Sequence, residues 1–154
     1  MEQRINAFHK GQKALSALYS LGTYLKNSTI DQELLNLIYY RVSQINGCAF
    51  CLDMHSKDLL AKGEDQQRLL VLNAWREAPF YTDRERAALG WAEAVTNITD
   101  GHVRDSDYEI ARAQFSEEEL IDLTIATVTI NCYNRINIAF RTTAGTYRVG
   151  QFAN

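Results

Sequence analysis

From Asn46 to His55 the chain reads NGCAFCLDMH. Gly47 marks the end of a helix, because glycine adopts the left-handed conformation with which many helices end. The preceding residues, 31–46, form an amphipathic segment that Asp31 can cap. The residues that follow favour a new helix over 48–62, with a glycine as its stop. The stretch therefore predicts two consecutive helices with a sharp break between them.

Three reactive side chains share one face of the second helix. An α-helix advances by about 100° per residue, so Cys51 lies roughly 60° from Cys48, and His55 lies roughly 40° from Cys51 in the opposite sense. Side chains three and four positions apart are those that meet on a helix. We therefore predict that the two sulfur atoms can approach bonding distance, with the imidazole one turn from Cys51.

The rest of the chain also favours helices. Helix formers dominate between the single proline and the scattered glycines, and no segment alternates apolar and polar residues for long. Two capping-box patterns, Thr82 with Glu85 and Ser116 with Glu119, mark helix starts. The sequence predicts a single all-α domain over residues 1–154 with about seven helices, the third of which begins at the cysteine pair. The predicted ranges are 3–26 with Gly11 as a weak point inside it, 31–46, 48–62, 64–76, 82–98, a short helix capped by Asp105 or Ser106, and 116–140.

Length and composition restrict the class of protein. The chain has 154 residues and a net charge of -3, with 46% hydrophobic and 23% charged residues, and one core is expected at this size. The scattered charges form no basic footprint for nucleic acid and no polybasic patch for a membrane surface. The first residues lack a signal-peptide pattern, and no apolar run is long enough to span a bilayer. We expect a cytoplasmic protein without a nucleic-acid or membrane partner.

A close cysteine pair in a reducing compartment is more often catalytic or metal-binding than structural. The thiolate is the attacking species, and an ordinary cysteine is mostly protonated at neutral pH. The helix N-terminus places partial positive charge near Cys48, whereas His55 can take the proton of Cys51. These influences favour different sulfur atoms, so the residues alone do not assign the nucleophile. After peroxide attack, the neighbouring thiol can convert the sulfenic acid into a disulfide.

Other roles for the pair fit the sequence less well. Buried cysteines can act as small hydrophobic residues, but here a histidine completes the same face. A zinc site normally needs a second ligand pair, and Cys132, His9 and His102 do not form one. Haem attachment needs a histidine directly after the second cysteine, where this chain has Leu52. We expect no metal and no prosthetic group, with Cys132 in the core and His102 exposed.

Around this motif the sequence resembles the alkylhydroperoxidase D-like (AhpD-like) branch of the carboxymuconolactone decarboxylase superfamily. The matching stretches are RVSQINGCAFCLDMH at 41–55, NAWREAP at 73–79, ERAAL at 85–89 and FSEEEL at 115–120. They follow one another in order along most of the chain. The resemblance implies an all-helical fold and peroxidase or disulfide-reductase activity without a metal or organic cofactor. It also implies assembly into trimers, dimers or hexamers.

The resemblance assigns roles to the three side chains. In peroxidase members the second cysteine of the motif attacks the hydroperoxide and the first resolves it. Carried over, Cys51 is peroxidatic, Cys48 is resolving, and His55 belongs to the proton relay. The implied function is an antioxidant peroxidase whose disulfide is reset by a dithiol donor protein or a lipoyl-type carrier. The alternatives are general thiol–disulfide exchange, a redox sensor, a decarboxylase-like reaction without redox chemistry, and a zinc-binding module.

One position departs from the family pattern. Many members carry a glutamate twelve residues before the first motif cysteine, where this chain has Asn36. Glu33, one turn earlier on roughly the same face, could complete the relay instead, and so could a water held by Asn36. Asp53 points about 160° away from the midpoint of the sulfur pair and is discounted. The departure predicts weak peroxidase activity, with thiol–disulfide exchange as the alternative.

Three asparagines recur at intervals of three residues along the predicted last helix: Asn131, Asn134 and Asn137. Residues at this spacing lie on one side of a helix. We expect them to hydrogen-bond neighbouring loop backbone rather than a ligand.

Overall fold

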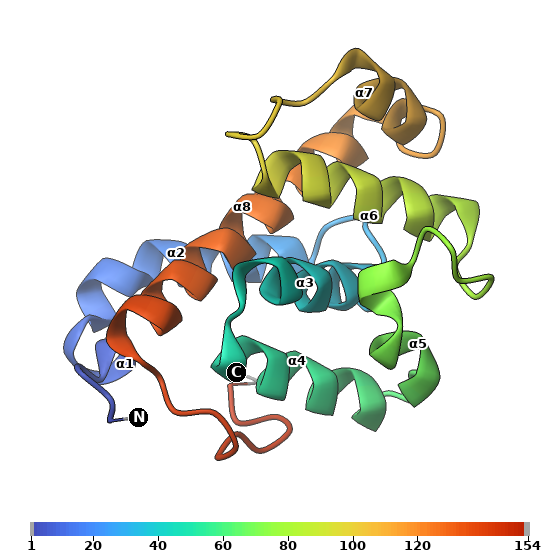
Figure 1. The fold of residues 1–154 in the computed structure, drawn as a ribbon. Coiled ribbons are helices and arrows are strands. Elements are labelled where there is room, and N and C mark those ends of the chain that lie inside the picture. The colour runs from blue at the N-terminus through green and yellow to red at the C-terminus, as the bar shows by residue number, and fades with distance from the viewer. Residues whose placement is uncertain (1, 153–154) are drawn as a thin grey trace.

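The computed structural model describes residues 2–152, and its regular elements are helices (Figure 1). The part of the chain that it describes contains no strand, and it has eight α-helices rather than about seven. The predicted all-α class is therefore confirmed. The elements are α1 (Ala7–Lys10), α2 (Gln12–Lys26), α3 (Gln32–Asn46), α4 (Ala49–Ala61), α5 (Gln66–Leu70), the 3-10 turn η1 (Leu72–Ala74), α6 (Asp83–Thr96), α7 (Asp105–Arg112) and α8 (Glu117–Phe140).

The predicted helix over 3–26 is divided at Gly11. This residue has φ -101° and ψ 15°, and a Cβ built on it would lie 2.7 Å from the carbonyl oxygen of Ala7. The close approach of the carbonyl oxygen requires glycine here, and a new helix starts at Gln12. Because of this division the cysteine pair opens the fourth helix, α4, rather than the third. The predicted helix over 64–76 is also shorter, since it is divided into α5 and η1.

Side-chain caps define the starts of the helices around the site. Asp31 accepts hydrogen bonds from two backbone N–H groups of α3, at 2.6 and 3.3 Å. Both predicted capping boxes are present, Thr82 with Glu85 at α6 and Ser116 with Glu119 at α8. Each cap satisfies backbone groups that the first turn leaves open and contributes about 1 kcal/mol.

The start of α7 differs from its prediction. Its N-cap is Arg104, not Asp105 or Ser106. Asp107 accepts hydrogen bonds from both the backbone N–H and the guanidinium of Arg104. The backbone N–H at the start of α7 is thus bonded by Asp107 in the first turn, and not by a side chain at the N-cap position.

Helix α3 occupies the centre of the fold. It packs against α4, α6 and α8, and in Figure 1 it lies between α4 and α6. Replacing one of its buried leucines by alanine should cost about 2–5 kcal/mol. This packing sets the position of the cysteine pair, which follows directly after α3. The buried apolar residues of α3 are Leu34, Leu35, Leu37, Ile38 and Val42.

After α8 the chain turns back toward α4 (Figure 1). Arg141 ends α8 in the left-handed conformation, with φ 55°. We call residues 141–152 the C-terminal segment. The hydroxyl of Tyr147 in this segment donates a hydrogen bond to Asp58 at 2.8 Å, and Lys57 donates to the carbonyl oxygen of Tyr147 at 3.1 Å. The segment is thereby attached to α4 beside the cysteines.

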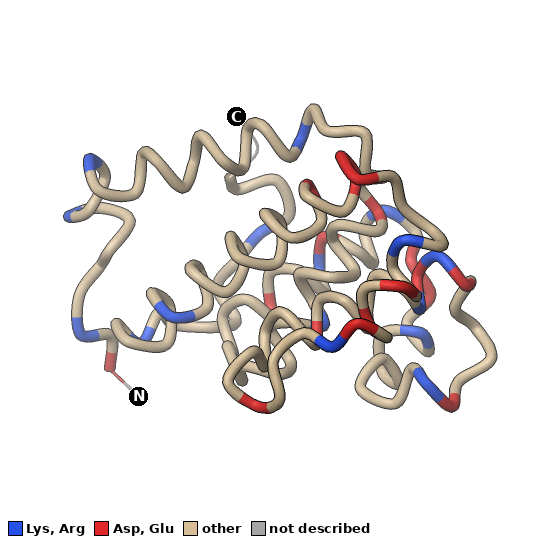
Figure 2. The backbone as a smooth tube through the Cα atoms, turned by 90° about the horizontal axis from the view of Figure 1, so that it is seen from above, with Lys and Arg blue, Asp and Glu red and all other residues tan. Residues whose placement is uncertain are grey.

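Lysine and arginine are interspersed with aspartate and glutamate along the chain (Figure 2). One such pair joins two core helices, because Arg41 of α3 lies 2.7 Å from the carboxylate of Glu93 on α6. Within residues 2–152, none of the helices has the length and apolar character needed to cross a membrane.

Candidate active site

The cysteine pair lies at the junction of α3 and α4. Gly47 ends α3 in the left-handed conformation, with φ 67°, as predicted. Cys48 is the N-cap of α4 rather than its first helical residue, and its Sγ accepts a hydrogen bond from the backbone N–H of Cys51 at 3.4 Å. A disulfide joins Cys48 to Cys51, with the Cα atoms 5.3 Å apart. The predicted approach of the two sulfur atoms is confirmed.

The disulfide is buried, and a pocket lies on one side of it. Both cysteines are 1% exposed, and they pack with Phe50 and Tyr147. The pocket has a volume of about 430 Å³ and includes Cys48 in its wall. We call it the cysteine pocket. Its other lining residues are Gly47, Ala49, Phe50, Asn137, Ile138, Arg141, Thr142, Thr143 and Ala144.

His55 lies one turn beyond Cys51 on α4 and is 7% exposed. Among the described residues, neither of its ring nitrogens has a hydrogen-bond partner. Its ring centroid lies 5.5 Å from that of Tyr39 on α3. Burial disfavours the imidazolium and lowers the pKa of His55 to about 4. In the disulfide form the imidazole is therefore neutral at pH 7, and its unprotonated ring nitrogen is an acceptor without a donor among the described residues.

Asn137 reaches the disulfide from the end of α8. Its Nδ2 lies 3.5 Å from the Sγ of Cys51 and donates to the carbonyl oxygen of Tyr133 at 2.9 Å. The side chain is buried, and its Oδ1 has no hydrogen-bond partner in residues 2–152. An amide N–H beside a sulfur favours the thiolate, because it places partial positive charge against the negative sulfur.

The asparagine repeat on α8 has partners other than the predicted loop backbone. Asn134 donates to the hydroxyl of Ser43 at 3.0 Å, and Asn131 donates to the hydroxyl of Thr96 at 3.0 Å. The spacing puts these amides on the face of α8 that packs against α3 and α6. The prediction of loop partners was therefore wrong. The sequence did not predict Asn137 as a site residue. The three-residue spacing that it shares with Asn131 and Asn134 was the pattern that could have indicated it.

The residues suggested for the relay do not hydrogen-bond to His55. The side-chain amide of Asn36 donates to a carbonyl oxygen of its own helix at 2.7 Å. Glu33 is exposed on the first turn of α3 and lines a different pocket. Asp53 is engaged by the C-terminal segment, since it accepts a hydrogen bond from the backbone N–H of Gly145 at 2.9 Å. In the described part of the chain, His55 thus has no carboxylate partner.

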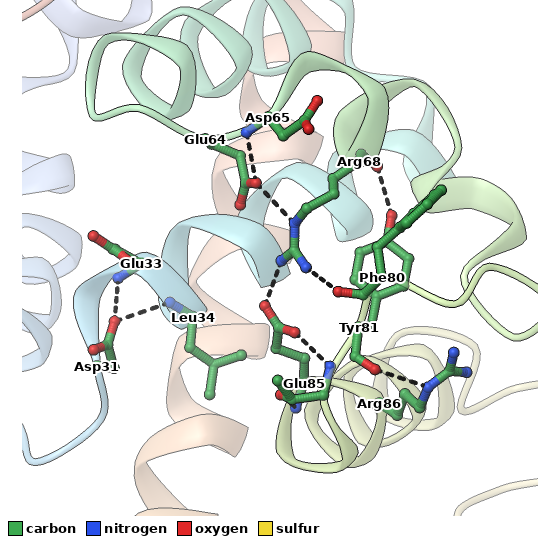
Figure 3. Close-up of polar contacts among 11 residues, drawn as sticks. Asp31, Glu33, Leu34, Glu64, Asp65, Arg68, Phe80, Tyr81, Glu85 and Arg86 are labelled. Carbon is green, nitrogen blue, oxygen red and sulfur yellow. Dashed lines mark hydrogen bonds and ion pairs between the residues drawn. The ribbon is translucent and has the colours of Figure 1, made fainter.

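Glu33 belongs to a pocket of about 270 Å³ at the other end of α4, which we call the charged pocket. Figure 3 shows the guanidinium of Arg68 between two carboxylates. Its Nε lies 2.8 Å from Glu64, and another of its nitrogens lies 2.5 Å from Glu85. The same guanidinium lies 4.8 Å from the ring centroid of Tyr81. None of the described residues of this pocket is a cysteine. The ion pair of Arg68 with Glu85 connects α5 to α6.

Metal ligands do not gather in residues 2–152, because no group of three or more histidine, cysteine, aspartate or glutamate side chains is placed to hold an ion. Cys132 is a free thiol of intermediate burial on α8, so it is less deeply buried than predicted. His102 is exposed in the loop before α7, with φ 59°. Neither residue joins the cysteine pair in a ligand set.

The sequence of this chain matches a known protein family. Residues 11–94 match the carboxymuconolactone decarboxylase family, and this stretch includes both paired cysteines and His55. The chain is also 40% identical over 139 residues to the uncharacterized protein YdfG of Bacillus subtilis (strain 168). That match covers 90% of this chain and 95% of YdfG.

Solved structures share the fold. One is a protein of unknown function from Agrobacterium tumefaciens, named a candidate antioxidant defence protein AhpD, with TM-score 0.90 and 40% identity. The match covers 95% of this chain and 100% of that one. The debrominase Bmp8 has TM-score 0.78 at 22% identity, over 90% of this chain and 74% of its own, which shows a shared fold alone. The chain therefore belongs to the carboxymuconolactone decarboxylase family, as an AhpD-like member.

Proposed function

We propose that this protein is a thiol-dependent peroxidase that reduces organic hydroperoxides with the dithiol of Cys48 and Cys51. The observation that carries the proposal is a buried disulfide that borders a pocket of about 430 Å³. A neutral histidine one turn away, with no hydrogen-bond partner among residues 2–152, supplies a proton acceptor. The AhpD-like fold supports a redox role for the pair.

The proposed reaction begins with the reduced protein. The proton of Cys51 passes to His55, because the thiolate that forms beside the ring stabilises the imidazolium that burial alone disfavours. The thiolate then attacks the distal oxygen of the hydroperoxide. The O–O bond breaks, the sulfur becomes a sulfenic acid, and the alkoxide takes the proton from His55 to leave as the alcohol. Cys48 then attacks the sulfenic sulfur, the S–S bond forms, and the hydroxide leaves as water with the Cys48 proton. Two electrons have passed from the dithiol to the peroxide.

The contact of Asn137 supports Cys51 as the attacking residue. Its Nδ2 lies 3.5 Å from the Sγ of Cys51 and would stabilise a thiolate at that atom. The partial positive charge at the start of α4 acts on the same turn of helix. Two of the three influences on the pair, the histidine and the amide, thus favour Cys51.

We propose that Cys48 is the cysteine through which the disulfide is reset, because it lines the pocket. An incoming thiolate attacks the Cys48 sulfur, and Cys51 leaves as a thiolate. The second thiol of the donor then resolves the mixed disulfide. The donor is therefore a dithiol, either a protein or a lipoyl-type carrier. Such a cycle fits a reducing compartment and so a cytoplasmic protein.

Self-association is also proposed. Ile121 and Val128 are 62% and 45% exposed and lie seven residues apart, so they share one face of α8. Tyr24 is exposed on α2, which packs beside α8. Adjoining exposed apolar side chains favour a protein interface. We expect a trimer, dimer or hexamer by light scattering, and a monomer in that measurement would contradict the proposal.

The peroxidase proposal is tested by treating the reduced protein with one equivalent of cumene hydroperoxide. We expect loss of two free thiols and of two hydrogens from the intact mass, mapped to the peptide that holds Cys48 and Cys51. Cys51→Ser should slow peroxide consumption by about a hundredfold or more, because the attacking atom is gone. Cys48→Ser should consume one equivalent and stop as the sulfenic acid, and Cys132→Ser should behave as the unmodified protein. Full turnover in both variants of the pair would reject the mechanism.

A second candidate function is general thiol–disulfide exchange. It is favoured by Asn36, which is hydrogen-bonded within its own helix at the position where the family resemblance implies a relay glutamate. Insulin reduction with dihydrolipoamide as the donor separates the two functions. Rapid insulin reduction without peroxide consumption supports exchange, and the opposite result supports the peroxidase.

A further inference from the structure

The cysteine pocket contains one charge that the proposed electron transfer does not use. Of its described lining residues, Arg141 alone carries a charge at neutral pH. Arg141 is half-buried, and its guanidinium takes part in no ion pair or hydrogen bond within residues 2–152. A partly desolvated cation without a counter-ion is unfavourable. An anionic group of a bound molecule would therefore be stabilised there.

The remaining walls of the pocket suit a molecule with an apolar body and one polar reacting end. Phe50 and Ile138 provide apolar surface. The Oδ1 of Asn137 and the Oγ1 of Thr142 are buried and have no partner among the described residues. Asn137 is 4% exposed, and its Oδ1 can accept a hydrogen bond from an O–H group. The same amide places its Nδ2 3.5 Å from the sulfur of Cys51.

We propose that the cysteine pocket binds organic hydroperoxides that carry a carboxylate. The carboxylate pairs with Arg141, the apolar body lies along Phe50 and Ile138, and the hydroperoxide O–H donates to the Oδ1 of Asn137. A volume of about 430 Å³ lies within the range of sites for small organic ligands. The proposal rests on the proposed peroxidase function and names its substrate class. The carboxylate takes no part in electron transfer. Arg141 therefore acts on which hydroperoxides bind, and not on the redox step itself.

A matched pair of substrates tests this assignment: cumene hydroperoxide and its para-carboxylate derivative, with dihydrolipoamide as the donor. We expect kcat/KM to be about tenfold higher for the carboxylate, mainly through a lower KM, because a charge-assisted contact is added. Arg141→Gln should remove this preference, whereas Arg141→Lys should keep most of it. Arg148→Gln makes the same change of charge at an exposed residue of the C-terminal segment outside the pocket wall, and it should keep the full preference. High salt should reduce the preference, because it screens the ion pair.

A binding measurement accompanies the kinetics and needs no turnover. In calorimetry, 4-isopropylbenzoate should bind the disulfide form about tenfold more weakly after Arg141→Gln, and equally well after Arg148→Gln. Equal kcat/KM for the two peroxides, or a preference that survives Arg141→Gln, would overturn the substrate class and leave the peroxidase function standing. Failure to turn over either peroxide would reject the peroxidase function, and with it the substrate class. Binding that is absent, or unaffected by Arg141→Gln, would reject the anion site itself.

Discussion

The two pockets at opposite ends of α4 differ in how their polar atoms are satisfied. In the charged pocket, Arg68 is held by Glu64 and Glu85. Around the disulfide, buried polar atoms lack partners: both ring nitrogens of His55, Oδ1 of Asn137 and Oγ1 of Thr142. These are the buried unpartnered side-chain nitrogen and oxygen atoms found in residues 2–152.

The difference distinguishes polar groups that stabilise the fold from polar groups that are available to a ligand. A buried polar atom without a partner costs free energy, and native proteins contain few of them. Charges that neutralise one another, as around Arg68, stabilise the fold instead. The site richest in charge is therefore the structural one, and the site with unsatisfied atoms is the candidate for chemistry.

The largest expected effect comes from breaking the charged pocket. Arg68→Met should lower the free energy of unfolding by about 3 kcal/mol, because it leaves the carboxylates of Glu64 and Glu85 partly buried without their counter-ion. Urea denaturation measures this loss. The exposed Lys62 of the same pocket is the control, and Lys62→Met should change stability little. If Arg68→Met instead left stability intact and slowed peroxide reduction, the distinction between the pockets would be lost.

A smaller effect is expected in the pH dependence of stability. The folded pKa of His55, about 4, lies below the unfolded value of about 6.5. Below pH 6.5 His55 binds a proton in the unfolded chain but not in the folded chain. The free energy of unfolding therefore falls as the pH falls toward 4. Between pH 7 and pH 5 the loss should be about 2 kcal/mol by urea denaturation. His55→Gln should flatten this slope and the exposed His102→Gln should not, and equal slopes in all three proteins would contradict the burial argument.

Removing the side-chain amide of Asn137, which lies beside Cys51, should have a somewhat smaller effect. Asn137→Leu keeps the bulk of the side chain and removes the N–H that lies 3.5 Å from the sulfur. The pKa of the reactive thiol should rise by about one unit, or about 1.4 kcal/mol, as measured by iodoacetamide alkylation of the reduced protein across pH. Asn131→Leu removes a member of the same repeat that contacts Thr96 instead, so it should lower stability and leave the thiol pKa unchanged. The same shift of pKa in both variants would argue against a specific role for Asn137.

The smallest effect concerns the attachment of the C-terminal segment. Burial, together with the hydrogen bond to Asp58, raises the pKa of Tyr147 to about 12. Tyr147→Phe removes that hydrogen bond and should cost about 1 kcal/mol in thermal or urea denaturation. Asp58→Asn keeps an acceptor and should cost less. Loss of peroxide reduction in Tyr147→Phe would show that the segment does more than cover the disulfide.

Features decided within a few residues of sequence were predictable. The cap at Asp31, the helix end at Gly47 and the meeting of Cys48 with Cys51 depend on contacts between near neighbours in the chain. Gly11 was also predicted as the weak point of the first helix, and the contact that divides the helix there is with Ala7, four residues earlier.

Features created by tertiary packing were not predictable in the same way. Asn137 and Cys51 are 86 residues apart in sequence, and they meet because α8 packs along α3 and α4. The relay suggested for Asn36 and Glu33 had a plausible helical spacing. However, the amide of Asn36 bonds to its own helix and Glu33 faces the charged pocket. A helical spacing identifies the face of a residue, but the neighbouring helices decide what that face meets.

Residues 137–144, which form much of the cysteine pocket, lie outside the stretch 11–94 that matches the family. The cysteine pair and these pocket residues therefore lie in separate parts of the sequence. A substitution at Arg141 can change the pocket wall without changing the cysteine motif. A relative with the same Cys-x-x-Cys but a neutral side chain in place of Arg141 would carry out the same reduction on different hydroperoxides.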